Sequence, residues 1–429
     1  MKKLLLINLF AIFGIGLLLS SCNETPSEIG FPFLRDTVSV EAVSSEKHPF
    51  IVDQKVQKQH SRFINMGGFL IGKAGEYKSM AFIRFETLKD TFKFITPEKI
   101  ISSTVTIKAL KYAFGDTTAP LAFDIYKVNK IWSPKTTWDS VTSAGADYID
   151  YSKKVGHYSA KVAQSDTGEV ITMDLDKALA SEWLFFGDDT LKYINKGIAF
   201  VPNENSKVIR KFAGPSLNDK SSSTFFSEVK IVFLNSQNKL DSVEMKTAME
   251  YALSDAPSHL DNPENATDIV LQGAVQYKTD LFFDLSSLPD NVAIHSATLE
   301  MTLNVGKSKL SNYGADSLRD LQITATYRKV SGVDTLTEAE KKISSAYGNK
   351  GADFVTYKFD LFTYIVEQWM LRDGKKGLVT LSKAPVQYEY NTIDKYVFYG
   401  LKDPDPTKRP KLKIVYSVRP SYNYKKGAQ

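Results

Sequence analysis

The chain of 429 residues contains similarities that recur in the same order in its two halves. The clearest match joins the segment ITMDLDKALASEW, which ends at Trp183, to the segment YKFDLFTYIVEQW, which ends at Trp369. It places Asp174 on Asp360. A glycine-led strand follows each tryptophan, and each half closes on an apolar strand. A collinear series of this kind is hard to obtain by chance, so the sequence predicts a tandem duplication.

Weaker matches precede this one in both halves. They pair Asp36 to Val40 with Asp241 to Met245, Leu70 to Gly72 with Leu271 to Gly273, Phe85 to Leu88 with Phe283 to Ser286, and Ile101 to Val105 with Ile294 to Thr298. We place the seam in the polar stretch 235–240 (NSQNKL), whose composition suits a linker. The predicted domains are therefore residues 31–236 and 237–418, followed by a tail, residues 419–429.

The pattern within each half favours strands. Short apolar runs recur between turn signals, and the segment from Ala297 to Leu303 alternates strictly between apolar and polar residues. Only the stretch before each tryptophan has helical spacing, as in Leu179 and Trp183. With 26 Phe and 21 Tyr, the composition also favours strands. We predict an all-β fold of two tandem antiparallel β-sandwich domains, each with a short capping helix.

The N-terminus has the order of a secretory signal. Lys2 and Lys3 precede an apolar run, and small residues lead to Cys22, the single cysteine. Ser20-Ser21-Cys22 after this run looks like a bacterial lipobox. We predict a lipoprotein signal peptide over residues 1–21, lipidation of Cys22 and a lipidated tether over residues 22–30. Its early acidic residues resemble the export signal of Bacteroidetes surface lipoproteins, which implies a lipid-anchored protein of the outer membrane, at the cell surface.

Charge gives little sign of a nucleic-acid partner. The formal net charge is +5, and removal of Lys2 and Lys3 with the signal peptide lowers it by two, to +3. Basic residues are dispersed along the chain and do not form the concentrated basic face of a nucleic-acid-binding protein. We therefore expect no nucleic-acid partner.

The sequence offers no recognisable catalytic set. The five histidines have no metal-binding spacing, and the common hydrolase, nucleotide-binding and metalloprotease motifs are missing. We predict no catalytic residue, no metal site and no cofactor. Three carboxylate pairs leave glycoside hydrolysis or a structural calcium ion open, although helix capping and a turn are the simpler interpretations. These pairs are Asp174 with Asp176, Asp188 with Asp189, and Asp403 with Asp405.

The aromatic residues divide by their surroundings. Trp132, Trp183 and Trp369 follow or lie within apolar segments, so we predict that they are core residues. Other aromatic residues lie in polar segments, where ordinary loop packing is the alternative to a role in binding sugar rings. The candidate ligand-binding residues are Trp138, Tyr148, Tyr151, Tyr388, Tyr390 and Tyr399. Tyr396 lies in the same loop and hairpin as the last three.

Both halves resemble the DNRLRE domain family. The order of residues in Phe283 to Pro289 and Ile294 to Leu299 is similar to that family, and so is the segment from Trp132 to Trp138. The first half has Glu86 where the family has Asp, and the second half lacks the paired tryptophan. The resemblance implies jelly-roll modules related to alginate-binding carbohydrate modules, and it supports the fold more than any particular ligand.

Taken together, these features predict a non-catalytic surface lipoprotein that binds an extracellular polymer, with a polysaccharide as the favoured ligand. Two linked modules raise the effective concentration of the second contact with a repetitive polymer. The alternatives are a structural or adhesion subunit of an outer-membrane assembly and a glycan-degrading lyase or hydrolase. The expected partners are a polysaccharide or matrix polymer, the membrane through the lipid anchor, and outer-membrane proteins.

Overall fold

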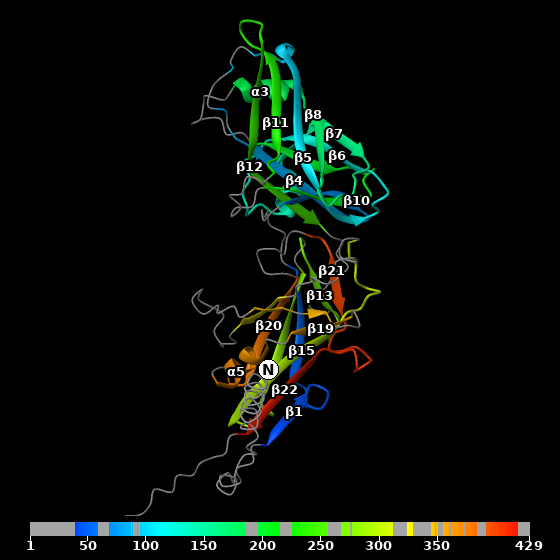
Figure 1. Ribbon diagram of the computed structural model, residues 1–429, viewed down its shortest axis with the longest axis vertical. Helices are drawn as coiled ribbons and strands as arrows, with labels where there is room; N and C mark the ends of the chain where they lie inside the picture. Colours follow the sequence, from blue (N-terminus) through cyan, green and yellow to red (C-terminus); the bar gives the residue numbers. More distant parts are fainter. Residues whose placement is uncertain are drawn as a thin grey trace, which may run out of the picture.

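Antiparallel strands form most of the regular structure of this protein in the computed structural model, which confirms the all-β prediction. The strands assemble into two lobes that follow one another along the long axis of the molecule (Figure 1). The residues that the structure describes are 39–58, 68–86, 88, 92, 95–185, 196–214, 225–255, 267–274, 277–311, 324–328, 345–347, 349–350, 355–359, 362–371, 374–383 and 392–418.

The first lobe is a closed arrangement of strands around one core. Its elements are β3 (Phe69–Ala74), β4 (Tyr77–Phe85), η2 (Pro97–Lys99), β5 (Ile100–Gly115), β6 (Leu121–Val128), α2 (Trp138–Thr142), β7 (Ile149–Ala160), β8 (Glu169–Asp174), α3 (Lys177–Phe185), β9 (Ile198–Pro202), β10 (Val208–Phe212), β11 (Glu228–Leu234) and β12 (Leu240–Asp255). The strand order is β12-β11-β5-β10-β3-β4-β9-β6-β7, with β8 on β5. The long strand β12 closes this sheet on itself, because its first part pairs with β11 and its second part pairs with β4.

The second lobe is a sandwich of two separate sheets. Its elements are β1 (Val40–Ser44), β2 (Ile51–Lys58), β13 (Ile269–Gln272), β14 (Tyr277–Asp284), β15 (Val292–Thr302), β16 (Thr324–Arg328), β17 (Ser345–Tyr347), β18 (Asn349–Lys350), β19 (Thr356–Phe359), α5 (Thr363–Leu371), β20 (Lys376–Ser382), β21 (Lys395–Phe398) and β22 (Lys411–Val418). One sheet has the order β1-β22-β15-β19-β18, and the other has the order β17-β16-β20-β14-β13-β21 with β2 on β14.

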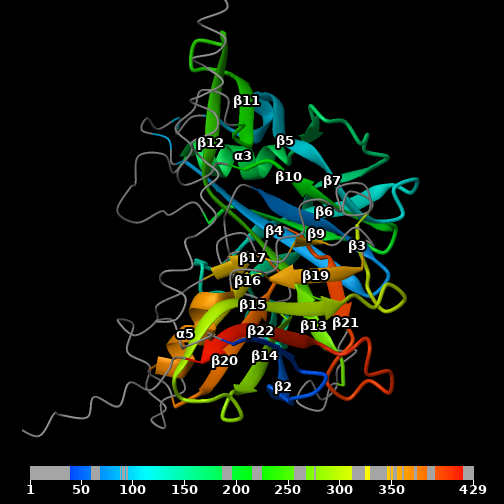
Figure 2. The same ribbon diagram turned by 60° about the horizontal axis from the view of Figure 1, so that its bottom comes forward.

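Strand pairing crosses the predicted boundary between residues 236 and 237. Strands β1 and β2 come from the predicted first domain, but they pair with β22 and β14 of the second lobe. Figure 2 shows the blue strand β2 beside β14 in that lobe. Strand β12 comes from the predicted second domain and completes the first lobe. The first lobe, residues 68–255, is therefore inserted between two parts of the second lobe.

The predicted linker at residues 235–240 is instead a tight hairpin turn within the first lobe. The backbone N–H of Asn235 donates to the carbonyl oxygen of Lys239 at 2.9 Å, and Asn238 adopts a left-handed conformation with φ of 55°. Asparagine tolerates that conformation well, and its side chain stabilises turns. The polar composition of this stretch therefore reflects a turn between β11 and β12 rather than a domain junction.

The two lobes repeat the same set of strand pairings. The pairs β4–β9, β5–β8 and β5–β11 of the first lobe correspond to β14–β20, β15–β19 and β15–β22 of the second. A buried hydrogen bond also recurs, because the Ser79 hydroxyl donates to Leu70 at 3.0 Å and the Thr279 hydroxyl donates to Val270 at 3.0 Å. This repetition supports the duplication inferred from the sequence.

The registers of the weaker sequence matches need correction. Lys230 and Lys413 occupy the same place in β11 and β22, and the residues paired with them set the register of their neighbours. On this basis Val40 corresponds to Leu240 and not to Met245, and Val105 corresponds to Leu299. The shifts are five positions and one position, and an odd shift places a residue on the opposite face of the strand. The sequence matches followed similar residue types and not the strand pairing, which alone sets the register.

One helix closes the core of each lobe, as predicted. Trp183 of α3 contacts Phe85 with ring centroids 5.8 Å apart, and Trp369 of α5 contacts Phe283 at 4.8 Å. Both tryptophans are buried, and so is Trp132, which confirms their prediction as core residues. The helix cap differs from the prediction, because the carboxylate that accepts from the N–H of Leu179 belongs to Asp176 and not to Asp174. Asp360 lies outside the described residues.

A third group of buried side chains joins the lobes. It includes Leu70, Tyr77 and Tyr112 from the first lobe and Val270 and Tyr277 from the second. The hydroxyl of Tyr112 also accepts a hydrogen bond from the backbone N–H of Ile393 at 2.9 Å. This contact gives the lobes a shared apolar interface with a specific polar link.

Candidate functional site

The sheet of the first lobe has an outer face that points away from the core of the lobe. This face is formed by the strands β12, β4, β9, β6 and β7. Alternate residues of a strand lie on opposite faces, so Ala81 and Ile83 belong to the core while Met80, Phe82 and Arg84 lie on the outer face. A separate apolar cluster covers this outer face. Helix α2 packs against β12 at its border and begins at a capping box formed by Thr137 and Ser140.

Five aromatic side chains lie partly exposed around this cluster, and we name the surface the aromatic face. They are Tyr126, Trp138, Tyr148, Tyr151 and Tyr251. Tyr151 is the most open of them, with 57% of its surface exposed, and its ring meets that of Tyr126 at 5.1 Å. The buried ring of Trp132 supports Tyr251 at 5.5 Å. The structure thus brings the predicted residues Trp138, Tyr148 and Tyr151 to one surface and adds Tyr126 and Tyr251.

Polar groups accompany these rings. Asp124 is buried at the aromatic face and forms an ion pair with Lys154 at 3.0 Å, and that hydrogen bond raises the pKa of Lys154. Lys130 lies over the ring of Tyr148 at 5.6 Å. Burial raises the pKa of Tyr126, with a further contribution from the charge of Asp124. Burial likewise raises the pKa of Tyr151, so both hydroxyls stay neutral and can donate or accept hydrogen bonds at neutral pH.

The remaining predicted aromatic residues do not join this surface. Tyr399 lies in the second lobe, where Lys408 covers its ring at 5.1 Å. Tyr396, from the same hairpin, is fully buried in the core of that lobe and is not a loop residue. Tyr388 and Tyr390 lie outside the described residues, as does the lipidation residue Cys22.

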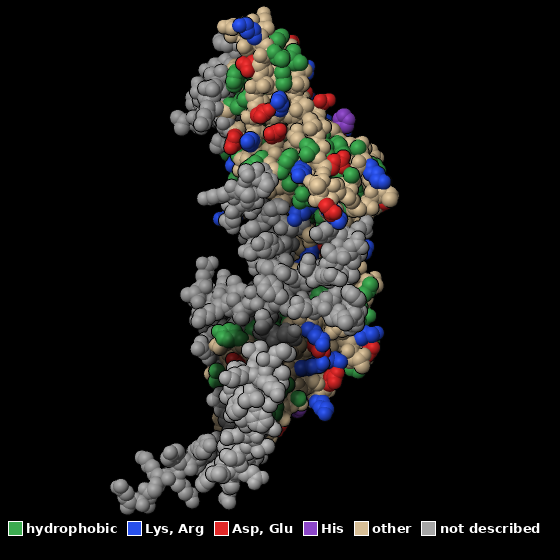
Figure 3. All heavy atoms as spheres, in the orientation of Figure 1, with side chains coloured by type: hydrophobic (Ala, Val, Ile, Leu, Met, Phe, Trp, Pro, Cys, Tyr) green, Lys and Arg blue, Asp and Glu red, His purple; other side chains and the backbone are tan. Residues whose placement is uncertain are grey.

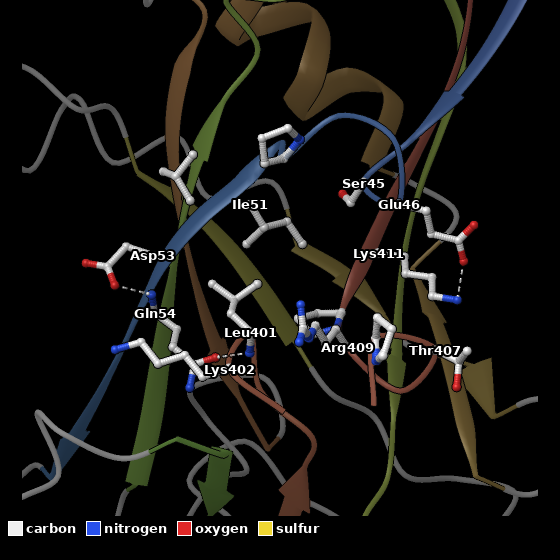
Figure 4. Close-up of a pocket in the computed structure, with 14 residues that line it drawn as sticks. Ser45, Glu46, Ile51, Asp53, Gln54, Leu401, Lys402, Thr407, Arg409 and Lys411 are labelled. Carbon is white, nitrogen blue, oxygen red and sulfur yellow. Dashed lines mark hydrogen bonds and ion pairs between the residues drawn. The ribbon is translucent and has the colours of Figure 1, made fainter. Parts of the chain in front are cut away.

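The second lobe contains a pocket of about 690 Å³ that the sequence did not reveal (Figure 4). Its walls are the segment from Ser45 to Gln54, which includes the loop between β1 and β2, and the segment from Leu401 to Lys411, which leads into β22. These segments lie about 350 positions apart in the chain, so no local motif could have united them. The volume is within the range of small-molecule sites.

Hydrogen bonds hold the two walls of the pocket together. The side chain of Gln54 accepts from the N–H of Leu401 at 2.8 Å and donates to the carbonyl oxygen of Thr267 at 2.9 Å. Gly400 permits this approach, since a Cβ atom there would lie 1.9 Å from that same carbonyl oxygen. The hydroxyl of Ser45 accepts from the N–H of Leu412 at 2.9 Å. The pocket is therefore built on fixed elements.

Charged side chains of both signs line this pocket. Figure 4 places Asp53 and Lys402 at one end, Glu46 and Lys411 at the other, and Arg409 between them. Lys411 pairs with Glu46 at 2.5 Å, and this hydrogen bond lowers the pKa of the Glu46 carboxyl. Three cations against two carboxylates leave the pocket with a formal charge of +1.

The carboxylate pairs of the sequence do not converge on a catalytic or metal centre among the described residues. Asp403 and Asp405 stabilise a turn, as expected, because Asp405 accepts from the N–H and the hydroxyl of Thr407 at 3.0 and 2.6 Å. Asp188 and Asp189 lie outside the described residues. Within the described ranges, no group of three or more His, Cys, Asp or Glu side chains is placed to hold a metal ion. In the same part of the chain, no helix is long and apolar enough to cross a membrane.

Comparisons with known proteins add little. No family model matches the chain, and no curated protein matches it. Among solved structures, the M60 catalytic domain with two CBM51 domains from Clostridium perfringens ZmpB is similar at 8% identity and a TM-score of 0.12. That match covers 86% of this chain and 38% of the other chain. A similarity at this TM-score carries no argument about fold or function.

Proposed function

We propose that this protein is a non-catalytic surface lipoprotein that binds an extracellular polysaccharide through the aromatic face of its first lobe. The observation that carries the proposal is the exposed ring of Tyr151, which rests on Tyr126. Tyr126 in turn lies within reach of the ion pair between the buried Asp124 and the exposed Lys154. The resemblance to carbohydrate-binding modules, drawn from the sequence, points to the same class of ligand.

The physical argument rests on the amphipathic character of a sugar ring. Its C–H groups pack against an aromatic face, while its hydroxyls need donors and acceptors nearby. Tyr126, Tyr151 and Tyr251 supply ring faces and neutral hydroxyls, and Asp124 and Arg84 supply charged partners. The rings rest on a packed sheet, so little conformational entropy is lost on binding.

Affinity electrophoresis tests this proposal. The purified protein is run in gels that contain one neutral or acidic polysaccharide each, beside Tyr151→Ala and the control Tyr364→Ala. Tyr364 suits the control because it is 45% exposed on α5 in the second lobe. We expect the retarding polysaccharide to bind Tyr151→Ala about tenfold more weakly, which equals about 1.4 kcal/mol. Tyr364→Ala should migrate like the unmodified protein.

Other results would favour the alternatives. Equal retardation of Tyr151→Ala and the unmodified protein would remove the aromatic face from the proposal. Turnover of the polysaccharide by the purified protein would favour a lyase or hydrolase. Failure to bind any polysaccharide, together with co-purification of an outer-membrane protein, would favour a structural or adhesion subunit.

A further inference from the structure

We propose that at high concentration two copies of this chain form a dimer in which β1 and β2 of each copy complete the second lobe of the other copy. The partner is therefore a second copy of the same chain, and exchanged strands make the contact. This inference goes beyond the proposed function and does not depend on the ligand of the aromatic face.

Each half of the chain already gives its opening strands to the lobe that the other half builds. Strands β1 and β2 pair with β22 and β14 of the second lobe, and β12 makes the equivalent pairs with β11 and β4 of the first. Val56 of β2 stands opposite Thr279 of β14. Ser254 of β12 stands opposite Ser79 of β4 in the same way. Reciprocal exchange of one element between two equivalent units is the arrangement of a domain-swapped dimer.

The two lobes also meet through equivalent positions. The shared cluster between them contains two pairs of counterparts, which are Leu70 with Val270 and Tyr77 with Tyr277. Burial is the main cause of the raised pKa of Tyr77, and the nearby hydroxyl of Tyr277 contributes to it. Contact between the same patch of two equivalent units is typical of a twofold interface. The chain thus has the contacts of a symmetric dimer whose two subunits are joined in one polypeptide.

The two lobes differ in how the exchanged strands are tied to their partners. In the first lobe, β12 follows β11 directly through the hairpin turn between Asn235 and Lys239, so both strands come from one copy. In the second lobe, Val40 of β1 pairs with Ser417 near the other end of the chain, and β2 leads into β3 of the first lobe. Connectivity within the second lobe therefore does not require that β1 and β2 come from the same copy.

Specific contacts hold β1 and β2 in the second lobe, and a second copy offers the same contacts. Phe50, between the two strands, is fully buried in the core of that lobe. The hydroxyl of Tyr416 donates to the carboxylate of Glu41 at 2.6 Å, and the side chain of Gln54 accepts from the N–H of Leu401 at 2.8 Å. An exchanged dimer keeps these contacts, so protein concentration and the linkage of the chain decide between monomer and dimer.

The chain is long enough for the lobes to stay docked in such a dimer. Val56 of β2 belongs to the shared cluster, so β1, β2 and the first lobe of one copy can dock as a unit on the second lobe of the other. Only the connection from Asp255 to Thr267 then crosses between the docked pairs, and it covers twelve positions (267 minus 255). Twelve positions span at most about 40 Å, which exceeds the diameter of a small domain, about 30 Å.

Disulfide trapping on the full-length chain tests the exchange, in a Cys22→Ser background that removes the single natural thiol. Ala42 of β1 lies opposite Val415 of β22, and neither belongs to the core. Copies with Ala42→Cys and copies with Val415→Cys are mixed, unfolded in urea and refolded together at increasing protein concentration. We expect a disulfide-linked dimer on a non-reducing gel, at least about tenfold stronger than from either variant alone, because paired positions of neighbouring strands lie within disulfide range.

The matched control is the equivalent pair of the first lobe. Ser242 of β12 lies opposite Val232 of β11, with the same exposure classes as Ala42 and Val415. Because the hairpin turn keeps β11 and β12 in one copy, a mixture of Ser242→Cys and Val232→Cys should give no more dimer than either variant alone. Equal dimer yields from the two mixtures would show random collision of unfolded chains and overturn the inference. Absence of a dimer from the first mixture at every concentration would do the same.

Light scattering of the Cys22→Ser protein gives a second measurement that needs no added cysteine, and it decides if a cysteine variant does not refold. We expect a species of twice the monomer mass whose share rises with the concentration at refolding. It should persist on dilution, because return to the monomer requires β1 and β2 to leave the second lobe. A monomer at every concentration, or a dimer that dissociates at once on dilution, would contradict strand exchange.

Discussion

At the scale of single residues, Glu250 is a carboxyl side chain buried in the first lobe at a cost to stability. It is 1% exposed, and its Oε1 has no hydrogen-bond partner among the described residues. The hydroxyl of Ser227 lies 3.5 Å from its other oxygen. Burial raises the pKa of the Glu250 carboxyl well above its ordinary value, which the Ser227 contact offsets only in part. The folded protein therefore favours the protonated form.

Replacement of Glu250 by Gln should stabilise the protein at neutral pH. A raised folded-state pKa means that the folded protein binds more protons than the unfolded chain above pH 4.5, so stability falls as pH rises through that range. The neutral amide of Glu250→Gln removes this penalty. We expect a gain in the free energy of unfolding at pH 7.5 of roughly 1–3 kcal/mol, the usual cost of a buried polar group without a partner, and this gain should shrink towards zero near pH 4.5. Urea denaturation at both pH values measures it, with the exposed Glu86→Gln as control, and a gain independent of pH would contradict the assignment.

At the scale of elements, the assignment of β2 and the preceding Phe50 to the second lobe can be tested by mutation. Phe50, directly before β2, is fully buried in the core of the second lobe, and its carbonyl oxygen accepts from the N–H of Asp284 at 2.9 Å. A division of the chain at residues 236 and 237 would assign Phe50 to the other lobe. The two assignments predict different consequences for the same substitution.

Phe50→Ala should destabilise the second lobe by about 3–5 kcal/mol, through loss of buried area and formation of a cavity. Native-state hydrogen exchange measures the effect element by element. We expect protection to fall for amides of β14, β15 and β22, and to change little in β5 and β11. Val105→Ala, in the core of the first lobe, is the matched control and should show the opposite pattern. Loss of protection in β5 after Phe50→Ala would contradict the assignment of Phe50 to the second lobe.

The sequence predicted which segments form helices and strands better than it predicted which strands pair with one another. The helix segments that end at Trp183 and Trp369 were matched in correct register, because an aligned acid, an apolar stripe and a tryptophan fix it. In the strands the match rested on a few similar residue types, so the exposed Val40 was set on the buried Met245, which lies on the opposite face from its true counterpart Leu240. The opening strands of the two halves also resemble each other, so either lobe can accommodate either strand by local pattern. Only the packed structure decides which lobe each one joins.

The residues of the candidate sites were likewise predicted where they are close in the sequence and missed where they are distant. Trp138, Tyr148 and Tyr151 were predicted because they cluster within one polar segment of the sequence. In the structure Trp138 and Tyr148 border the same apolar cluster, and Tyr151 joins them through its contact with Tyr126. Tyr126 and Tyr251 were missed, since the first lies in an apolar strand and the second beyond the predicted domain boundary. Arg409 follows a proline-rich turn that gave no sign of a ligand. Its pocket exists only because distant segments meet.

At the scale of the whole molecule, the described surface carries mixed charge, with basic and acidic side chains interspersed on the face drawn in Figure 3. The two lobes are joined by two passages of chain, one between β2 and β3 and one between β12 and β13, and by the shared cluster around Tyr112. The first described strand, β1, belongs to the second lobe. An anchor at Cys22 would therefore attach the protein through the second lobe and present the aromatic face beyond it.

The proposed anchor makes a clear prediction. Cys22→Ser removes the thiol that would carry the lipid, so the variant should appear in the soluble fraction after cell lysis, while the unmodified protein stays with membranes. Immunoblotting of the two fractions measures this, and Ser21→Ala serves as a control that keeps the thiol. Retention of Cys22→Ser in the membrane fraction would show that another feature holds the protein there.

The insertion of one lobe within the other also sets an order of events during synthesis. Every strand of the first lobe has been synthesised once residue 255 is made, so that lobe can assemble from a continuous stretch of chain. The second lobe must wait, because Val40 pairs with Ser417, 377 positions further along (417 minus 40). Contacts between such distant positions form slowly, and until they form β1 remains without its partner β22, while β2 waits for β14. The first strands to be made are therefore among the last to find their places.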